Sequence, residues 1–197
     1  QGIPVFSLLS DFAQGSRAGY FGLNNLKVGR TAAWMISLAA KEKGKVAIFV
    51  GGTRFHGHDL RETGFRSYLR ENRPDLDVLE PIVNLETRQL TFDTVRRMLA
   101  RHPDLRGIYV AGGGMEGAIA ALREARAPGE VSLVVNELTP ESRAALISRY
   151  ATMAIATPLP RLCTDLIVLA AEAVAKGMTS VQGQHFLPPD LYLPESV

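Results

Sequence analysis

The sequence predicts an α/β fold in which parallel strands are flanked by helices. Short apolar segments rich in β-branched residues alternate with amphipathic helical segments along the 197 residues, an order typical of a parallel sheet with helices on both faces. Glycines interrupt the chain where strands end, at Gly51-Gly52 and at Gly112 to Gly114. The apolar content of 46% is enough to bury a core, as one large domain or as two small lobes.

The predicted strands are short, and the predicted helices each carry one apolar face. The strands cover residues 3–9, 20–23, 45–50, 75–79, 107–111, 131–135 and 153–156. The helices cover residues 29–43, 58–72, 91–101, 116–125, 139–149 and 160–177. Thr139, Pro140 and Glu141 make the clearest helix start: a cap, a proline at the first helical position and an acid in the first turn. The tail at 185–193 reads as extended, and Pro188-Pro189 excludes a central strand position there.

Composition argues against several classes of function. The net charge is +2, and the densest basic run is Arg96-Arg97 with Arg101 on the next helical turn. Nucleic-acid binders concentrate basic residues on one face, so this segment itself is not expected to grip DNA. The single cysteine, Cys163, excludes a disulfide within the chain and a zinc-binding cysteine cluster, and it fits a reducing compartment. The longest apolar stretch, 162–175, is too short and too polar to span a bilayer.

Three further residues and one segment are assigned structural roles. Cys163 is expected inside an apolar helix face, and Trp34 and Met35 are expected to pack in the interior. Gly2 to Val5 reads as an internal strand and not as a signal peptide.

Polar residues that follow strands are the candidate binding residues, because open parallel sheets bind ligands at the carboxyl ends of their strands. Gly112 to Gly114 can present backbone N–H groups to a ligand, although plain turn geometry is the more ordinary reading. This run matches neither the dinucleotide-binding glycine pattern nor the P-loop. Ser10-Asp11 and Asn136-Glu137 also end strands, and each pair either takes a ligand hydroxyl or forms an ordinary loop.

A polar segment at 54–61 follows another strand. It contains Arg54, Phe55, His56, His58, Asp59 and Arg61. The two histidines stand two residues apart, which suits a loop but not one helix face, and no third metal ligand is placed by the sequence. Polar contact with a small ligand is therefore favoured over a metal site, with a solvated helix start as the alternative. Arg61 is the preferred binding residue because its donor fork suits a carboxylate or vicinal hydroxyls; an exposed helix arginine is the plainer reading.

The sequence offers no arrangement for catalysis. Ser10 lacks the G-x-S-x-G setting of a nucleophile, and no base is paired with it. We therefore expect a binding protein without cofactor or metal, not an enzyme. A small α/β enzyme that uses His56 and His58 is the less favoured alternative.

The order of short motifs resembles the effector domain of LacI/GalR transcription regulators. Gly2 to Val5 followed by Ser10-Asp11 is similar to their "IPVV…SD", and Arg61 with Gly64-Phe65 is similar to "R-x-x-GF". Residues 20–25 with 29–33, 110–115, 134–139 and 155–160 stand where that family has "YVGxDN…GRxAA", "ANDxMA", "VGYDDT" and "TIxQP". Residues 191–195 resemble the "LxLPE" ending of some members. The motifs follow in order along essentially the whole chain.

The resemblance implies the type I periplasmic-binding-protein fold, in which three crossovers join two α/β lobes around a ligand. It places the crossovers near Asn24-Asn25, near Glu137-Leu138 and near residues 178–184. Residues 1–24 with 138–178 would form part of the N-terminal lobe, and residues 25–137 with 179–197 would form the C-terminal lobe. The first lobe would be truncated, and the DNA-binding headpiece would lie outside this chain.

The resemblance also implies a ligand site. Arg61 and Glu137 match the family's ligand-binding arginine and aspartate. The predicted ligand-binding residues, which combine this match with the strand-end residues, are Asp11, Phe55, His58, Arg61, Gly112, Asn136 and Glu137.

Several positions depart from the family pattern. Gly112-Gly113 replaces its Asn-Asp pair, Asn24 replaces the aspartate of "DN", and Leu8 or Leu9 stands where the first strand has an acid. The aromatic residue that stacks on sugar falls near Leu85-Glu86. Buried hydroxyls need hydrogen-bond partners, so these losses predict an unusual sugar or a ligand that is not a sugar.

The main functional hypothesis is the ligand-sensing domain of a LacI-type regulator. It would be cytoplasmic and homodimeric, bind a sugar-like effector, and alter the grip of a headpiece on operator DNA. The alternative is a secreted solute-binding protein of an ABC transporter or chemotaxis system. A helix-turn-helix or a signal peptide ahead of the chain would discriminate between the two, and the "LxLPE" tail favours the regulator.

Overall fold

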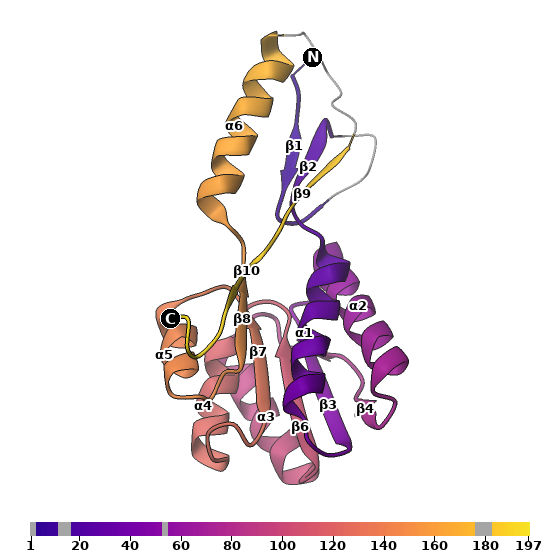
Figure 1. Ribbon diagram of the computed structural model, residues 1–197, viewed down its shortest axis with the longest axis vertical. Helices are drawn as coiled ribbons and strands as arrows, with labels where there is room; N and C mark the ends of the chain where they lie inside the picture. Colours follow the sequence, from indigo (N-terminus) through magenta and orange to yellow (C-terminus); the bar gives the residue numbers. More distant parts are fainter. Residues whose placement is uncertain (1–2, 12–16, 53–54, 176–182) are drawn as a thin grey trace. The chain divides into compact units, whose positions relative to one another are not determined.

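The computed structural model describes residues 3–11, 17–52, 55–175 and 183–197, and within them the chain forms two α/β units (Figure 1). Unit 1 consists of Gln1–Asn24 and Thr157–Asp190, and unit 2 consists of Asn25–Ala156 and Leu191–Val197. Parallel strands and flanking helices make up both units, which confirms the predicted fold class.

The predicted unit boundaries are correct at one point and wrong at two. The chain leaves unit 1 after Asn24, as predicted, but it returns after Ala156 and not after residue 137. The reason is that β8 (Met153–Ala156) pairs in parallel with β7 (Ser132–Asn136) and is therefore a strand of unit 2. The last boundary lies after Asp190 and not after residue 178, because β9 (Gln184–Leu187) pairs with β2 (Gly19–Leu23) in unit 1.

The described part of unit 1 contains a three-stranded parallel sheet and one helix. The strand order is β1 (Phe6–Leu8), β2, β9, and the helix is α6 (Leu159–Ala175). All residues of the central strand β2 are buried. Pro188-Pro189 lies between the edge strand β9 and β10 (Asp190–Tyr192), an edge strand of the other sheet, as the sequence predicted.

Two residues assigned to the interior are exposed. Cys163 lies on the exposed side of α6, because that helix is apolar on more than one side and Leu162 and Ala173 are its buried residues. Trp34 is 42% exposed, whereas Ala33 and Ile36 beside it are fully buried. None of the helices among the described residues is long and apolar enough to cross a membrane.

Within the described residues, unit 2 is built on a seven-stranded sheet. Its order is β10, β8, β7, β6 (Leu105–Val110), β3 (Gly44–Val50) and β4 (Leu76–Val78), with β5 (Ile82–Val83) also pairing with β3. The pairs among β3 to β8 are parallel. The sequence did not predict β5. This strand has only two residues and follows Pro81 directly, so it shows no alternating apolar pattern.

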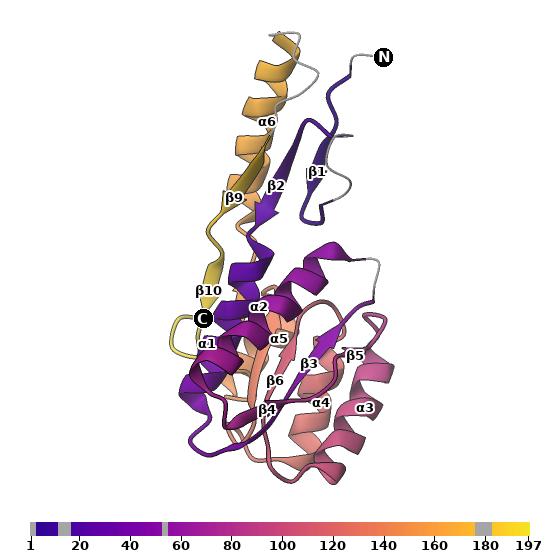
Figure 2. The ribbon, with the colours of Figure 1, turned by 90° about the vertical axis from the view of Figure 1, so that its right-hand side faces the viewer.

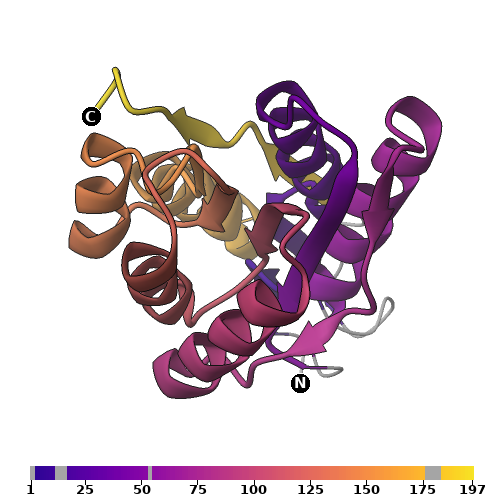
Figure 3. The same cartoon turned by 90° about the horizontal axis from the view of Figure 1, so that it is seen from below.

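Helices cover both faces of this sheet (Figures 2 and 3). One group is α1 (Asn25–Ala39) and α2 (His56–Asn72), and the other is α3 (Arg88–Arg101), α4 (Met115–Ala125) and α5 (Pro140–Ile147). Alternate residues of β6 serve the two faces: Ile108 and Val110 join the core with α3 and α4, whereas Tyr109 stacks on Phe65 of α2. The sheet is therefore buried on both sides, as expected for parallel strands.

A glycine allows α1 and α2 to pack closely. A Cβ atom placed on Gly64 of α2 would lie 2.1 Å from the carbonyl oxygen of Leu26 in α1. No side chain fits at that distance unless the two backbones separate.

We expect the substitution Gly64→Ala to destabilise the protein by about 1–3 kcal/mol, through overpacking. Helix propensity alone predicts the opposite sign, a gain of about 1 kcal/mol. Urea unfolding followed by circular dichroism measures the difference. The matched control is Arg70→Ala at an exposed position of the same helix, which should change stability by less than about 0.5 kcal/mol. A Gly64→Ala protein more stable than the wild type would contradict the close contact.

Tyr109 places its phenolic hydroxyl in the core. The residue is fully buried, and its hydroxyl donates a hydrogen bond to Oδ1 of Asn136 at 2.8 Å. Burial raises the pKa of Tyr109 from 10.0 to about 12, against the opposing positive charge of Arg61.

This pKa predicts a loss of stability in strong alkali. Between about pH 10 and pH 12 the unfolded chain loses the Tyr109 proton while the folded protein keeps it, so the free energy of unfolding falls as the pH rises. The expected loss approaches about 3 kcal/mol, since one pKa unit corresponds to about 1.4 kcal/mol. Urea unfolding across this range should show a steeper fall for the wild type than for Tyr109→Phe. Equal slopes would show that the hydroxyl is not buried in the folded protein.

Candidate functional site

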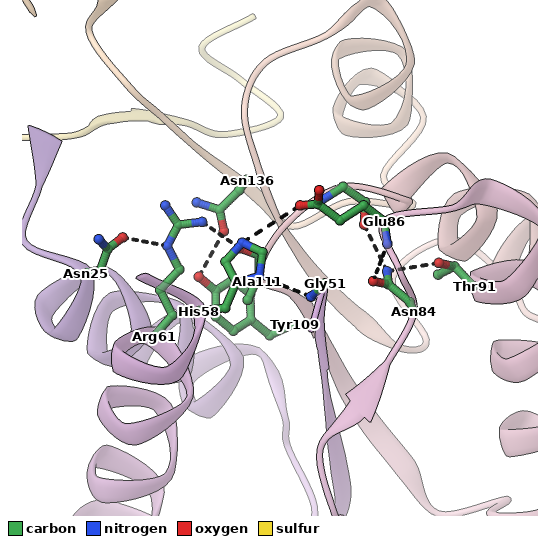
Figure 4. Close-up of polar contacts among 11 residues, drawn as sticks. Asn25, Gly51, His58, Arg61, Asn84, Glu86, Thr91, Tyr109, Ala111 and Asn136 are labelled. Carbon is green, nitrogen blue, oxygen red and sulfur yellow. Dashed lines mark hydrogen bonds and ion pairs between the residues drawn. The ribbon is translucent and has the colours of Figure 1, made fainter. Parts of the chain in front are cut away.

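Polar residues gather in unit 2 at the carboxyl ends of β3, β5, β6 and β7 (Figure 4). These strands are parallel, so their ends lie along one edge of the sheet. The first turns of α1 and α2 add side chains to the same edge. This edge is the position at which open parallel sheets bind ligands.

Arg61 of α2 is held by two neutral acceptors. Its Nε donates to Oδ1 of the buried Asn25 at 2.7 Å, and its Nη1 donates to the carbonyl oxygen of Ala111. Arg61 itself is partly buried. The exposed-arginine reading is therefore wrong, and the guanidinium is fixed at the end of β6.

Asn136, the last residue of β7, has a buried donor without a partner. Its side chain is 4% exposed, and its Oδ1 is occupied by the Tyr109 hydroxyl. The Nδ2 atom has no hydrogen-bond partner among the described residues. Val110 pairs with Val135, so Asn136 is next to Ala111, the residue that holds Arg61. Buried polar groups without partners are rare and cost about 1–3 kcal/mol, so this amide marks a place for a ligand acceptor.

His58 is a buried, neutral donor. Its Nδ1 accepts a hydrogen bond from the backbone N–H of Gly51 at 3.0 Å, which places the ring proton on Nε2. Burial is the main cause that lowers the pKa of His58, and the positive charge of Arg61 adds to it, against a smaller effect of Glu86. The imidazole is therefore uncharged at pH 7. The ring of Phe55 lies 4.9 Å from the His58 ring, centroid to centroid.

A strained turn after β5 brings Glu86 to the same edge. Leu85 and Glu86 have φ values of 50° and 57°, in the left-handed region that non-glycine residues rarely adopt. Asn84, almost fully buried, holds the turn: its Oδ1 accepts from the Glu86 N–H, and its Nδ2 donates to Thr91 and to the carbonyl oxygen of Gly113. Strain of this kind collects at functional sites.

Gly112 is needed where His58 and Glu86 approach the end of β6. A Cβ atom on Gly112 would lie 2.5 Å from Cε1 of His58 and 2.8 Å from Oε1 of Glu86. The same Glu86 oxygen accepts the N–H of Gly113 at 3.2 Å and lies 3.8 Å from Nε2 of His58. The glycine run therefore serves close packing of side chains against the backbone.

The structure brings five of the seven predicted residues together at this edge: Phe55, His58, Arg61, Gly112 and Asn136. Glu137 follows Asn136 directly, but its side chain is exposed and its φ is 68°. Its backbone N–H donates to the carbonyl oxygen of Ile155 at 2.8 Å. The binding role of each residue stays a prediction.

Asp11 belongs to unit 1, where its carboxylate already has partners. Arg17 and Ser7 donate to it at 2.7 and 2.8 Å, and Gln184 donates at 3.3 Å. Burial alone would raise the pKa of Asp11, but these hydrogen bonds and the charge of Arg17 outweigh burial and lower it. The residue thus ties together the segments of unit 1.

Four residues of the edge were not predicted: Asn25, Asn84, Glu86 and Tyr109. Asn25 lies in the segment that resembles "YVGxDN", but it was assigned to a crossover and not to the site; Asn84 follows a two-residue strand and had no motif to mark it. Tyr109 reads as an ordinary core residue. Glu86 had a signal, because it stands where the resemblance places an aromatic residue.

The described residues contain no group of three His, Cys, Asp or Glu side chains placed to hold a metal ion. His58 is buried and His56 is exposed, so the two histidines do not converge. Arg54, the first residue of the predicted polar segment 54–61, lies outside the described residues.

Several solved structures with the same fold are named as binding proteins. GanP, a glucose-galactose binding protein from Geobacillus stearothermophilus, superposes with a TM-score of 0.89 at 19% identity, covering 99% of this chain and 69% of its own. An ABC transporter solute-binding protein from Actinobacillus succinogenes with bound D-allose gives 0.87 at 20% identity, covering 99% and 70%. Another from Agrobacterium vitis, bound with α-D-tagatopyranose, gives 0.87 at 23% identity, covering 98% and 68%. At these identities the likeness shows the fold.

The sequence itself gives the family. No curated protein matches the chain. A family model described as a periplasmic binding protein domain matches residues 1–178. The LacI/GalR identity implied by the motif order is not confirmed by these matches. The chain belongs to the periplasmic binding protein domain family.

Proposed function

We propose that this chain binds a small polyhydroxylated solute, sugar-like in chemistry, at the polar edge of unit 2. The observation that carries the proposal is the buried, unpartnered Nδ2 of Asn136 beside the fixed guanidinium of Arg61. A ligand oxygen that accepts from both groups would remove the cost of the unmade hydrogen bond. The sugars bound by proteins of the same fold support this ligand class.

Within this proposal, the chain serves as a solute-binding protein of a transport system and not as an enzyme. The structural neighbours named as ABC transporter solute-binding proteins support this role. The effector domain of a LacI-type regulator is the second candidate, and the order of the sequence motifs favours it. The regulator would be cytoplasmic and would act as a dimer on operator DNA.

A thermal-shift panel tests binding. The full-length protein is mixed with D-glucose, D-galactose, D-allose and D-arabinose, with their alditols and with their aldonates. We expect at least one compound to raise the melting temperature, because a ligand at 100 times its Kd stabilises the native state by about 2.7 kcal/mol. If no compound of the panel raises the melting temperature, the proposed ligand class is refuted.

The substitution Asn136→Asp tests the site. It keeps an oxygen for the Tyr109 hydroxyl and replaces the unpartnered donor by an acceptor, so we expect the affinity for the selected compound to fall about 10- to 100-fold. Isothermal titration calorimetry measures the Kd, and a thermal melt of the free protein checks the fold. The matched control is Asn72→Asp at an exposed position of α2. If both variants bind like the wild type, the solute does not use Asn136.

Cell fractionation separates the two roles. In the organism that makes the protein, an antibody against the chain should detect it outside the cytoplasm if it is a transport component. Detection in the cytoplasm, together with binding of the full-length protein to promoter DNA from its own locus, would establish the regulator instead.

A further inference from the structure

Arg61 differs in its partners from two other arginines of α1 and α2. Among the described residues, no carboxylate forms an ion pair with its guanidinium, whereas Arg66 on the same helix pairs with Glu62 and Arg30 of α1 pairs with Glu71. The two groups that hold Arg61, the Asn25 side chain and the Ala111 carbonyl, are neutral. A partly buried charge without a counter-charge is costly, so the empty part of the donor fork is a place for an anion.

The neighbours of Arg61 at this edge also offer donors. Asn136 presents only its N–H groups, because the Tyr109 hydroxyl occupies its oxygen. His58 presents Nε2–H, because the Gly51 N–H occupies Nδ1. The 3.8 Å between this Nε2 and Oε1 of Glu86 is too long for a hydrogen bond.

Glu86 brings an acceptor to this edge, on the far side of His58 from Arg61 (Figure 4). Its side chain is 39% exposed, and its carboxylate accepts a hydrogen bond from the N–H of Gly113. The edge is thus cationic and donor-rich at Arg61 and Asn136, and anionic at Glu86. A ligand carboxylate is attracted to the first end and repelled by the second, whereas ligand hydroxyls can donate to Glu86.

We propose that the solute is a sugar acid, a polyhydroxylated carboxylate whose carboxylate binds Arg61 and Asn136 and whose hydroxyls reach towards Glu86. The inference rests on the proposed function and narrows its ligand class. A neutral sugar brings hydroxyls that both donate and accept, and it leaves the Arg61 charge unbalanced. A carboxylate only accepts hydrogen bonds, so it suits the N–H donors of Arg61 and Asn136, and its negative charge balances that of Arg61.

Matched pairs of ligands test the inference on the wild-type protein without any variant. Isothermal titration calorimetry compares D-gluconate with D-glucose and D-glucitol, and D-galactonate with D-galactose and galactitol. We expect one aldonate to bind at least about tenfold tighter than its neutral partners. Its affinity should fall as NaCl is raised, because a charge contact is screened by salt.

Variants locate the effect. Arg61→Gln keeps side-chain N–H donors and removes the charge, so it should weaken aldonate binding about 30-fold or more while changing neutral-sugar binding only a few-fold. Arg70→Gln, at an exposed position of the same helix, is the matched control and should bind like the wild type. Thermal melts of the free variants check that both fold.

The outcomes separate this inference from the proposed function. Neutral sugars that bind as tightly as the aldonates, with Arg61→Gln affecting both equally, would overturn the sugar-acid assignment and leave the sugar-binding proposal intact. No binding of any polyhydroxylated compound would overturn both. Tight aldonate binding that survives Arg61→Gln would show that the ligand carboxylate binds elsewhere, and it would reject Arg61 as its partner.

Discussion

Burial of the unit 2 sheet on both faces is the constraint on which the rest of that unit depends. Parallel strands covered by two layers of helices leave little room for polar side chains, and the buried residues inside β3, β6, β7 and β8 are accordingly apolar between the strand ends. Polar chemistry is displaced to the strand termini. Tyr109 is the exception, and its hydroxyl is tolerated because it reaches Asn136, the last residue of the neighbouring strand. The core therefore positions the site: the tyrosine decides which end of the Asn136 amide remains available.

The same arrangement explains why the site is made mostly of donors. Three acceptors at this edge are already used within the protein: the Asn25 oxygen and the Ala111 carbonyl by Arg61, and the Asn136 oxygen by the Tyr109 hydroxyl. The hydrogen-bonding groups that remain available on Arg61 and Asn136 are therefore N–H donors. Glu86 reaches the edge only through two successive residues in left-handed conformations, a strained geometry that Asn84 stabilises with three hydrogen bonds.

The fold was predictable from the sequence because its signals are local. Apolar periodicity located the helices and most strands, and the Thr139-Pro140 start is present with the Thr139 side chain accepting from Ser142 N–H. The errors came from non-local facts. Nothing in residues 138–156 says that β8 pairs with β7, so the unit boundary was misplaced. The burial of Trp34 and Cys163 was inferred from residue type, which does not say which side of a helix meets a partner.

The candidate site was predictable in position but not in composition. Position after a predicted strand indicated His58 and Asn136, and the donor geometry of an arginine side chain indicated Arg61. The unmade hydrogen bond of Asn136 depends on where Tyr109 lies, on the preceding strand and 27 residues away in the chain, and no sequence pattern encodes that contact. Glu86 was noticed only as a missing aromatic residue, because the sequence does not show that it folds back over Gly112.

The discontinuity of the two units has a consequence for synthesis. The strands β3 to β8 of unit 2 and all its helices come from one continuous stretch, Asn25–Ala156, so this core can assemble on the ribosome as soon as that stretch has emerged. Unit 1 combines β1 and β2, which precede Asn25, with α6 and β9, which follow Ala156. The sheet of unit 1 is therefore completed after the core of unit 2, although β1 and β2 precede that core in the chain. During that interval the apolar strand β2 lacks β9, the strand that flanks it in the finished sheet.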